Sequence, residues 1–398
     1  LMYPQKPLCQ TKILDLTGFN SLGSGINSMV AVMSYSGYDI EDAQIHSSSA
    51  IDRGFMRCMV MKRYTSTIKR TEMGPSPESA SLSSLDSDGI VFSGSRVKVG
   101  DALMGKLQQH SGQSASQPTR FLGPKPAIVD SVVVSSSEPG TALVKVMTRD
   151  FRAPEVGDKF SSRHGQKGVC GLMVHQNNLP FNETGMVPDI IMNPHGFPSR
   201  MTVGKLIELI AGKKALFEGQ FADSTSFCKN TTKEVCQSLV QHGFNYSGKD
   251  IFYSGTTGEM LPGYVFYGPI FYQKLKHLVL EKLHARSQGP NSILTRQPVK
   301  GRNRNGGQRL GEMERDCFIG YGAAMLLQER FLISSDATKI NVCRTCKYMC
   351  SGSTCTFCKS SRTSSITMPY ACKLLMHELQ GMGIKPSIDI DTDLSSIL

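Results

Sequence analysis

The chain has 398 residues, which is enough for two or three domains that each bury a hydrophobic core. Its formal net charge is +11 at pH 7, which favours a polyanionic partner such as nucleic acid. The sequence has no apolar run long enough to span a bilayer and no signal peptide at its start, so we expect a soluble intracellular protein with no membrane contact.

Short apolar runs alternate with turns over residues 1–62, and Ala31–Tyr35 reads as a buried strand. The acids Glu41 and Asp42 follow the turn at Gly37. Adjacent acids usually lie solvated at the surface, but carboxylates are also the ligands that Mg²⁺ prefers, and Mg²⁺ often takes only one or two of them. Both interpretations stay open from these residues alone.

Residues 66–125 are rich in serine and proline, so we expect the least ordered part of the chain there, without chemistry of its own. The following stretch, 128–147, alternates valine and isoleucine with polar residues. That alternation predicts a pair of half-buried strands.

The segment Gly157–Gly168, with the sequence GDKFSSRHGQKG, places four basic side chains between glycines: Lys159, Arg163, His164 and Lys167. Glycines let the backbone approach a ligand closely, and lysine and arginine supply charge and donors for phosphate oxygens. Phosphate handling is therefore indicated. A solvated basic loop is the alternative, because such loops are common.

Residues 187–200 contain three prolines and a glycine, which predicts a loop of defined shape. A helix is expected over 201–216, with its inner face formed by Leu206, Ile207, Leu209 and Ile210. Arg200 stands at the start of this helix, where its guanidinium can donate two hydrogen bonds to a phosphate.

Three further helices are expected, over residues 231–242, 271–286 and 369–380. The second has a basic outer face and precedes a series of basic residues. These side chains either are simply solvated or form a surface that follows phosphates. The series comprises Arg296, Lys300, Arg302, Arg304 and Arg309.

The twelve cysteines are unevenly placed, and five of them crowd into residues 343–358, a pattern typical of a metal site in a reducing compartment. Two Cys-x2-Cys pairs formed by Cys343, Cys346, Cys355 and Cys358 suit tetrahedral coordination of a structural Zn²⁺. An iron-sulfur cluster and four free thiols are the alternatives. Cys350 is not expected to be a ligand.

Five motifs occur in a characteristic order. They are Gly-Tyr-Asp-Ile-Glu-Asp at 37–42, the basic segment at 157–168, Asn-Pro-His-Gly-Phe-Pro-Ser-Arg-Met-Thr-Val at 193–203, Leu-Gly-Glu-Met-Glu-Arg-Asp-Cys at 310–317 and the four cysteines. With them the chain resembles, over nearly its whole length, the second-largest subunit of multisubunit DNA-directed RNA polymerases. The first and third motifs look most like the eukaryotic polymerase III version. Since the family's subunit is much longer, the chain is expected to be its C-terminal part.

The resemblance implies an α+β, mixed multidomain fold with a double-psi β-barrel hybrid-binding domain and a small C-terminal zinc-binding clamp domain. The hybrid-binding domain would comprise residues 1–62 and 151–306, interrupted by a wall- or flap-like variable region at 63–150. An anchor- or switch-like segment would occupy 307–335, and the clamp domain 336–398.

The resemblance also implies roles for individual residues. Lys159 and Lys167 would be catalytic residues near the RNA 3′ end, and Glu41 and Asp42 would lie beside a nucleotide-borne Mg²⁺. Arg200 would hold the triphosphate of the incoming nucleotide. The residues implied to contact nucleic acid are Arg163, Arg302, Arg304 and Arg309.

The function that the resemblance implies is extension of RNA 3′ ends with NTPs by two-metal nucleotidyl transfer. The expected partners are the largest polymerase subunit, other polymerase subunits, template DNA and the RNA–DNA hybrid, in the nucleus. The chain lacks the family's first-metal motif, so it is expected to be an enzyme only within the multisubunit complex. The alternatives are the equivalent subunit of polymerase I or II and a non-catalytic, zinc-stabilised nucleic-acid-binding relic.

Five positions depart from the family pattern. Gln44 and His46 stand where the family has apolar residues, and Gln288 replaces an arginine. Asn303 and Asn305 replace a serine and an aspartate, which puts any contact of that acid in doubt.

Overall fold

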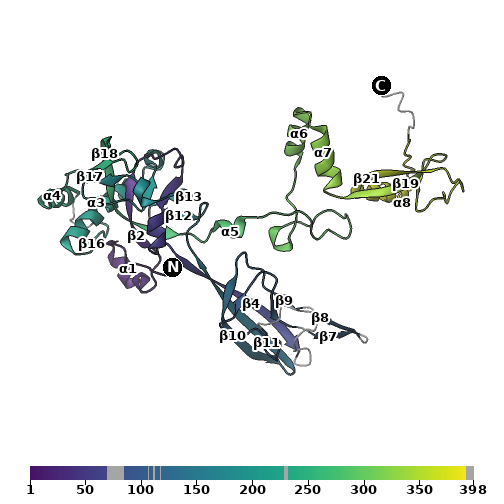
Figure 1. Ribbon diagram of the computed structural model, residues 1–398, viewed down its shortest axis with the longest axis horizontal. Helices are drawn as coiled ribbons and strands as arrows, with labels where there is room; N and C mark the ends of the chain where they lie inside the picture. The colour runs from purple at the N-terminus through teal and green to yellow at the C-terminus, as the bar shows by residue number, and fades with distance from the viewer. Residues whose placement is uncertain (70–84, 106, 111–112, 117, 228–231, 391–398) are drawn as a thin grey trace. The chain divides into compact units, whose positions relative to one another are not determined.

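The computed structural model describes residues 1–69, 85–105, 107–110, 113–116, 118–227 and 232–390. The chain divides into two compact units, Leu1–Lys282 and Leu283–Leu398, which we call unit 1 and unit 2. Figure 1 shows the ribbon of both units, with many of the helices and strands labelled. Both units combine helices with sheets, so the mixed α+β multidomain class predicted from the sequence is confirmed.

The main sheet of unit 1 has eight strands in the order β12-β13-β3-β15-β2-β18-β17-β14. Strand β12 also pairs with β18, so the six strands from β12 to β18 in this order form a closed ring of pairings. The β13–β3 and β15–β2 pairs are parallel, and the other pairs of the ring are antiparallel. The strands are β2 (Ile26–Val32), β3 (Ala43–Ser47), β12 (Lys159–Ser162), β13 (Lys167–Val174), β14 (Phe181–Asn182), β15 (Ile190–Met192), β17 (Lys249–Tyr253) and β18 (Met260–Lys274).

The ring is buried on both faces of its central strands. Val30 and Ile190 pack into one hydrophobic cluster, and their neighbours Ala31 and Ile191 pack into another. A strand covered on both faces has a continuous apolar sequence, which explains the run at the end of β2. The predicted buried strand at Ala31 is therefore confirmed, although it ends at Val32.

Helix α3 (Val203–Glu218) packs against β18. It lies where the sequence predicted a helix, but the predicted inner face was partly wrong, because Ile207 is 40% exposed. The buried face instead includes three charged residues at helical spacing: Lys205, Glu208 and Lys213. These side chains are buried because each finds a polar partner in a neighbouring element.

The helix expected over residues 271–286 is wrong over most of its length. Residues 260–274 form β18, which pairs with β2 from Phe266 to Tyr272 and then with β12 up to Lys274. Only α5 (Val279–Lys282) is helical in this stretch. Backbone pairing with β2 and β12 makes residues 271–274 part of this strand.

A second sheet of unit 1 has the strand order β4-β11-β10-β5. Its strands are β4 (Cys58–Lys69), β5 (Arg96–Val97), β10 (Ala127–Glu138) and β11 (Thr141–Arg152), so the predicted strand pair at 128–147 is confirmed. Three described residues of the serine-rich segment, Val91, Leu103 and Phe121, pack into the hydrophobic core of this second sheet. The remainder of that segment, including 70–84, lies outside the described residues.

The other elements of unit 1 are short. Strand pairs are formed by β1 (Cys9–Gln10) with β16 (Ala222–Asp223), β6 (Ala102–Met104) with β9 (Thr119–Arg120) and β7 (Leu107–His110) with β8 (Gln113–Ser116). The helices are α1 (Lys12–Leu16), α2 (Ser48–Asp52) and α4 (Thr232–Gln241), and the 3-10 turns are η1 (Phe19–Ser21), η3 (Gln176–Asn178) and η4 (Pro194–Gly196).

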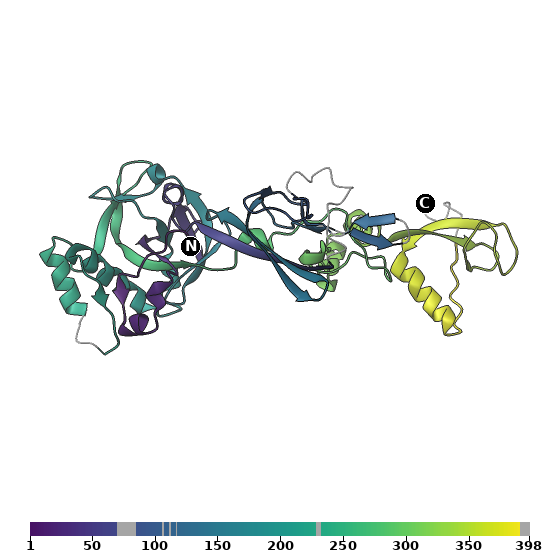
Figure 2. The same cartoon turned by 90° about the horizontal axis from the view of Figure 1, so that it is seen from below.

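Unit 2 contains a three-stranded sheet in the order β20-β19-β21. Its elements are η5 (Arg302–Arg304), α6 (Glu312–Gly320), α7 (Ala324–Gln328), the π-helical turn η6 (Glu329–Ile333), β19 (Ala337–Cys343), β20 (Met349–Cys350), β21 (Thr363–Pro369) and α8 (Tyr370–Gly381). Helix α8 follows β21 directly, with Pro369 as its N-cap, close to the predicted start (Figure 2). Across the described residues of both units, no helix is long and apolar enough to cross a membrane.

Candidate functional site

A cavity of about 600 Å³ in unit 1 brings together two segments that are far apart in the sequence. One wall comes from the turn after β2, and the other comes from η4 and the residues that lead into α3. The lining residues are Ser34, Ile40, Glu41, Asp42, Asn193, His195, Gly196, Ser199 and Arg200. The predicted acids and the predicted phosphate-binding arginine thus share one pocket.

Within this pocket Arg200 forms an ion pair with Asp42, with 2.6 Å between Nη2 and Oδ1. Both side chains are partly open to solvent, at 36% and 41% exposure, so a ligand can reach them. Glu41 also lines the pocket and has a φ of 58°, a left-handed conformation that is uncommon for a residue with a side chain. The turn therefore holds the two acids in a defined and locally strained arrangement.

The buried Asp39 fixes the backbone of this turn. Its carboxylate accepts hydrogen bonds from Ser34 Oγ (3.3 Å) and from the Tyr35 N–H (3.1 Å). Asn193 Nδ2 donates to the Asp39 carbonyl oxygen at 3.0 Å, which ties the turn to the opposite wall of the pocket.

The same Asn193 orients His195. Because Nδ2 of the amide donates to Asp39, Oδ1 points to His195 and accepts from its backbone N–H (2.9 Å) and from Nδ1 (2.8 Å). An amide oxygen only accepts, so Nδ1 carries the proton and Nε2 of the neutral ring is an acceptor. The sequence assigned no role to His195, because nothing in it shows that this turn lines a pocket.

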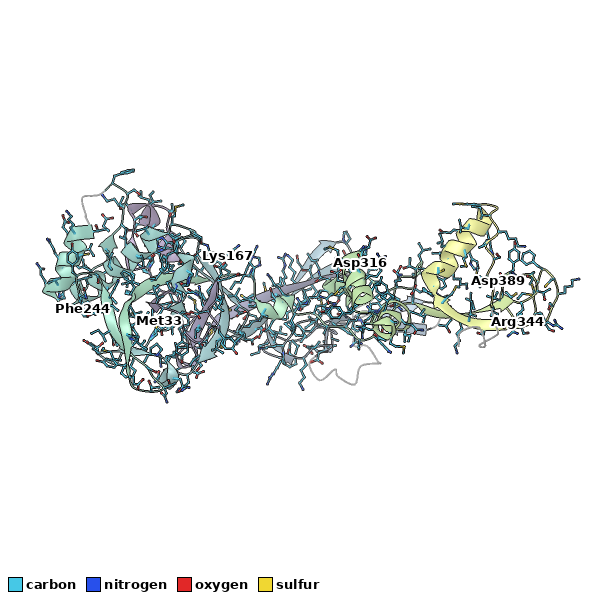
Figure 3. The ribbon with its side chains drawn as sticks, turned by 90° about the horizontal axis from the view of Figure 1, so that it is seen from above. Met33, Lys167, Phe244, Asp316, Arg344 and Asp389 are labelled. Atoms are coloured by element: carbon cyan, nitrogen blue, oxygen red, sulfur yellow. The ribbon has the colours of Figure 1, made fainter. Side chains whose placement is uncertain are left out.

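The basic segment 157–168 forms β12, a turn and the start of β13 beside Asp42. The Val169 N–H donates to the Asp42 carbonyl at 3.1 Å. A Cβ on Gly168 would lie 2.5 Å from that carbonyl oxygen, so only glycine permits this approach. Lys167 is exposed at the surface of unit 1 and Lys159 is half-buried (Figure 3).

A cluster of positive charge surrounds His277, just after β18. Lys282 contributes most to lowering the pKa of His277, together with partial desolvation and the charges of Lys159, Lys276 and Lys167. Both lysines of the basic segment thus lie within electrostatic reach of His277. Sequence reasoning did not identify His277, because the incorrect helix over 271–286 separated it from the basic segment.

Arg163 and His164 turn inward, toward α3. Arg163 Nη2 lies 2.6 Å from Glu208 Oε1 and Nη1 donates to the Cys9 carbonyl at 3.0 Å, while His164 Nε2 is hydrogen-bonded to Glu208 Oε2. Burial alone would raise the pKa of Glu208, but the hydrogen bond from His164 and the charge of Arg163 outweigh it and lower the pKa. A nucleic-acid phosphate would have to compete with Glu208 for Arg163.

The departures Gln44 and His46 point into the core of unit 1. His46 is fully buried against the Phe160 ring, with 4.6 Å between ring centroids. Neither ring nitrogen has a hydrogen-bond partner among the described residues. Burial, helped by the charge of Lys274, lowers the pKa of His46 to about 3, so the ring is neutral.

The remaining predicted arginines lie in unit 2. Arg302 and Arg304 belong to η5, and both Arg304 and Arg309 are exposed. The turn ends at Asn305, whose φ of 50° is left-handed, and its carbonyl accepts from Arg286 Nη1 at 2.6 Å. Asparagine and aspartate both tolerate this conformation, so the departure at 305 preserves the turn.

The four predicted cysteines of unit 2 converge at the end of β19. The Sγ atoms of Cys343, Cys346, Cys355 and Cys358 all lie within 4.8 Å of one another. Contacts of 3.4 Å join Cys343 to Cys358 and Cys346 to Cys355. Cys350 stays outside this group, and its Sγ lies 3.6 Å from the Tyr348 carbonyl oxygen.

Backbone N–H groups stabilise a thiolate in this cluster. Hydrogen bonds from the N–H groups of Cys358 and Phe357 lower the pKa of Cys355 to about 6, against some desolvation. The thiolate is the form of cysteine that binds metal.

Comparisons with known proteins show the family of the chain. Residues 1–304 match the family model "RNA polymerase Rpb2, domain 6", and residues 306–391 match "RNA polymerase Rpb2, domain 7". The chain is 49% identical to DNA-directed RNA polymerase III subunit RPC2 of Drosophila melanogaster, over 98% of the chain and 37% of that protein. It is 48% identical to the Saccharomyces cerevisiae protein of the same name, over 98% of the chain and 36% of that protein.

RNA polymerase II relatives are somewhat less similar. DNA-directed RNA polymerase II subunit RPB2 of Schizosaccharomyces pombe is 40% identical, over 98% of the chain and 35% of that protein. The chain therefore spans little more than a third of the length of these relatives. It belongs to the family of second-largest subunits of DNA-directed RNA polymerases and corresponds to Rpb2 domains 6 and 7.

Proposed function

We propose that the chain forms part of the catalytic centre of a DNA-dependent RNA polymerase of class III, where it helps to extend RNA 3′ ends with NTPs. The observation that carries this proposal is the pocket that joins Asp42 and Arg200, with Lys167 on the strand that abuts Asp42. Class III is supported by identities of 44–49% to polymerase III subunits, against 40–41% to polymerase II subunits.

In the proposed mechanism Arg200 leaves Asp42 and donates two hydrogen bonds to the triphosphate of the incoming nucleotide. Lys159 and Lys167 neutralise charge around the RNA 3′ end and the transferred phosphate. Phosphoryl transfer depends mainly on positioning and electrostatic stabilisation, which fixed lysines provide. The charge cluster around His277 extends this positive surface with Lys276 and Lys282.

Asp42 and Glu41 fit a Mg²⁺ ion that arrives with the nucleotide. Two carboxylates are too few for an all-protein site, but Mg²⁺ commonly combines one or two carboxylates with substrate phosphates and water. When bound, Mg²⁺ would supply Lewis-acid stabilisation of the phosphate oxygens. Asp42 is available for this role once Arg200 has moved to the triphosphate.

The same proposal assigns the parts of the fold. The six-stranded ring would be the double-psi β-barrel of the hybrid-binding domain, made from residues 1–62 and 151–306. Residues 63–150 would form the wall or flap, 307–335 an anchor or switch segment and 336–398 the clamp domain.

The four cysteines fit a structural Zn²⁺. With Zn–S bonds of about 2.3 Å, the sulfurs of a tetrahedral site are about 3.8 Å apart. The observed contacts of 3.4 and 3.7 Å are close to that spacing. Four thiolates leave no open position for a substrate, so the metal would hold the clamp domain together without taking part in the reaction.

The partners follow from the same assignment. Arg302, Arg304 and Arg309 would contact phosphates of the template DNA or the RNA–DNA hybrid, and Arg163 would do so only on leaving Glu208. The largest subunit would supply the first metal site, so activity requires the assembled enzyme. A polymerase III subunit would work in the nucleus.

The proposal is tested with polymerase assembled around a complete second-largest subunit that carries Arg200→Ala. The Michaelis constant for NTP should rise about 10-fold or more, since an arginine–phosphate contact contributes roughly 1.5–3 kcal/mol. Template binding should not change. An unchanged Michaelis constant would contradict the substrate-binding role, and equal losses of template and NTP binding would favour the non-catalytic relic.

A further inference from the structure

Lys205 lies in the first turn of α3 and is completely buried. Its Nζ donates to Gln166 Oε1 at 3.0 Å and to Tyr272 Oη at 2.8 Å, and it lies over the rings of Tyr272 (5.0 Å) and Phe197 (5.9 Å). In the described part of the chain no carboxylate forms an ion pair with it. A buried lysine held by neutral partners is unusual, because burial of an ammonium group is costly unless it is paired.

The contact with Lys205 decides which way the side-chain amide of Gln166 points. Only the oxygen of an amide accepts a hydrogen bond, so Oε1 must face Lys205 and Nε2 must face away. On that side Nε2 donates to the Gly196 carbonyl at 3.3 Å and to Thr202 Oγ1. We call the chain of contacts from Lys205 through Gln166 to Gly196 and Thr202 the Lys205 relay.

The relay connects the two segments that carry the proposed phosphate ligands. Gln166 directly precedes Lys167, and Gly196 and Thr202 stand on either side of Arg200. Both Gln166 and Lys205 are buried, so solvent does not replace these contacts. One buried amide, that of Gln166, therefore links the segment of Lys167 directly to the segment of Arg200.

We propose that Lys205 is a positioning residue that acts through Gln166 to hold Lys167 and Arg200 in register for the triphosphate and the RNA 3′ end. This inference rests on the proposed function, because it assumes that both side chains meet phosphate groups. Small displacements of such groups reduce phosphoryl transfer strongly, since the reaction depends on alignment.

The charge of Lys205 provides a signature that a purely structural residue lacks. Burial lowers the pKa of Lys205 to about 7, while Glu208 of the same helix opposes the shift and Arg200 adds to it. The neutral amine still donates to Gln166 and accepts from the Tyr272 hydroxyl, so the relay exists in both protonation states. A triphosphate beside Arg200 would favour the ammonium form, so substrate binding should be linked to proton uptake at Lys205.

The test compares assembled polymerases that carry Lys205→Met, Gln166→Glu or Lys213→Met in a complete second-largest subunit. Lys213 is the matched control, because it is also a buried lysine of α3 but forms an ion pair with Asp250 of β17 at 2.6 Å. Each variant is assayed for single-nucleotide extension between pH 6 and 8, for the Michaelis constant of NTP, and for thermal unfolding.

Lys205→Met should lower the extension rate 10-fold or more without lowering the unfolding temperature, because the relief of burying an amine offsets the lost contacts to Gln166 and Tyr272. It should also abolish the change in the Michaelis constant around pH 7. Gln166→Glu retains an acceptor for Lys205 but cannot donate to the Gly196 carbonyl, so its extension rate should fall similarly. Lys213→Met should show the opposite pattern, with a lower unfolding temperature and a normal extension rate.

The inference is overturned if Lys205→Met extends RNA at the wild-type rate, or if its extension rate and unfolding temperature fall together as a packing defect would produce. If polymerase with Lys205→Met does not assemble, the Gln166→Glu variant becomes the deciding test. A normal extension rate of the Gln166→Glu polymerase would refute the relay. Arg200→Ala and Lys167→Ala distinguish a failure of the relay from a failure of the proposed function. If they impair extension and the relay variants do not, only the relay is wrong; if all four extend normally, the proposed function fails.

Discussion

Arg200 and Asp42 are 2.6 Å apart and neutralise each other in a pocket open to solvent. One is the predicted ligand of the triphosphate and the other the predicted ligand of the nucleotide's magnesium. A magnesium–triphosphate complex offers negative charge to Arg200 and positive charge to Asp42. Its entry can therefore replace the one ion pair with two. The ion pair thus keeps both side chains at the pocket in the absence of substrate.

Asp42→Asn should raise the Mg²⁺ concentration needed for half-maximal extension and lower the extension rate about 10- to 100-fold, since a charge-assisted contact contributes roughly 1.5–3 kcal/mol. The measurement is a magnesium titration of RNA extension by the assembled polymerase. Asp130→Asn serves as the control, because Asp130 also pairs with an arginine, Arg149, but lies in the second sheet. An unchanged magnesium requirement for Asp42→Asn would exclude this acid as a metal ligand.

The four-cysteine cluster should bind one zinc ion per chain. Cys355→Ser removes one of the four sulfurs, so bound zinc measured by atomic emission should fall to background. Cys350→Ser should retain zinc, since Cys350 lies outside the cluster. Retention of zinc by the first variant, or its loss from the second, would mean that the ligand set is wrong.

The buried His46 should make the fold sensitive to acid. Its pKa is about 3 in the folded chain, well below the ordinary 6.5, so the unfolded state binds a proton first as the pH falls. The contribution of His46 to the free energy of unfolding is fully present above about pH 6.5. It is lost as the pH falls toward 3, by about 1.4 kcal/mol per pH unit. His46→Leu should reduce this slope in denaturant unfolding between pH 6.5 and 5. The same slope in wild type and variant would contradict this interpretation.

The sequence was most informative where chemistry depends on local spacing. Two Cys-x2-Cys pairs bring their own sulfurs together, so Cys343, Cys346, Cys355 and Cys358 were found from sequence alone. The alternation over 128–147 likewise predicted a pair of half-buried strands, which are neighbours in the chain and pair with each other. Pairing Asp42 with Arg200 required the family resemblance, because no local pattern connects these two positions.

Burial of charged residues could not be predicted in this way. Lys205, Glu208 and Lys213 were not part of the predicted inner face of this helix, because their partners Gln166, His164 and Asp250 come from other elements. The failed helix over 271–286 has the same origin. Its first residues, 271–274, instead pair with β2 and β12, and no local window of the sequence contains these pairing edges.

The most direct test of the central claim is RNA extension on a primed template by polymerase that carries Lys167→Ala, with template binding measured in parallel. Lys125→Ala is the control, because Lys125 is a partly exposed lysine paired with Glu155. Extension should fall about 100-fold or more for Lys167→Ala, as for loss of a group that stabilises a transition state, while template binding changes little. Wild-type extension by Lys167→Ala, or a loss of extension that only follows a loss of binding, would contradict a role of this chain at the transfer step.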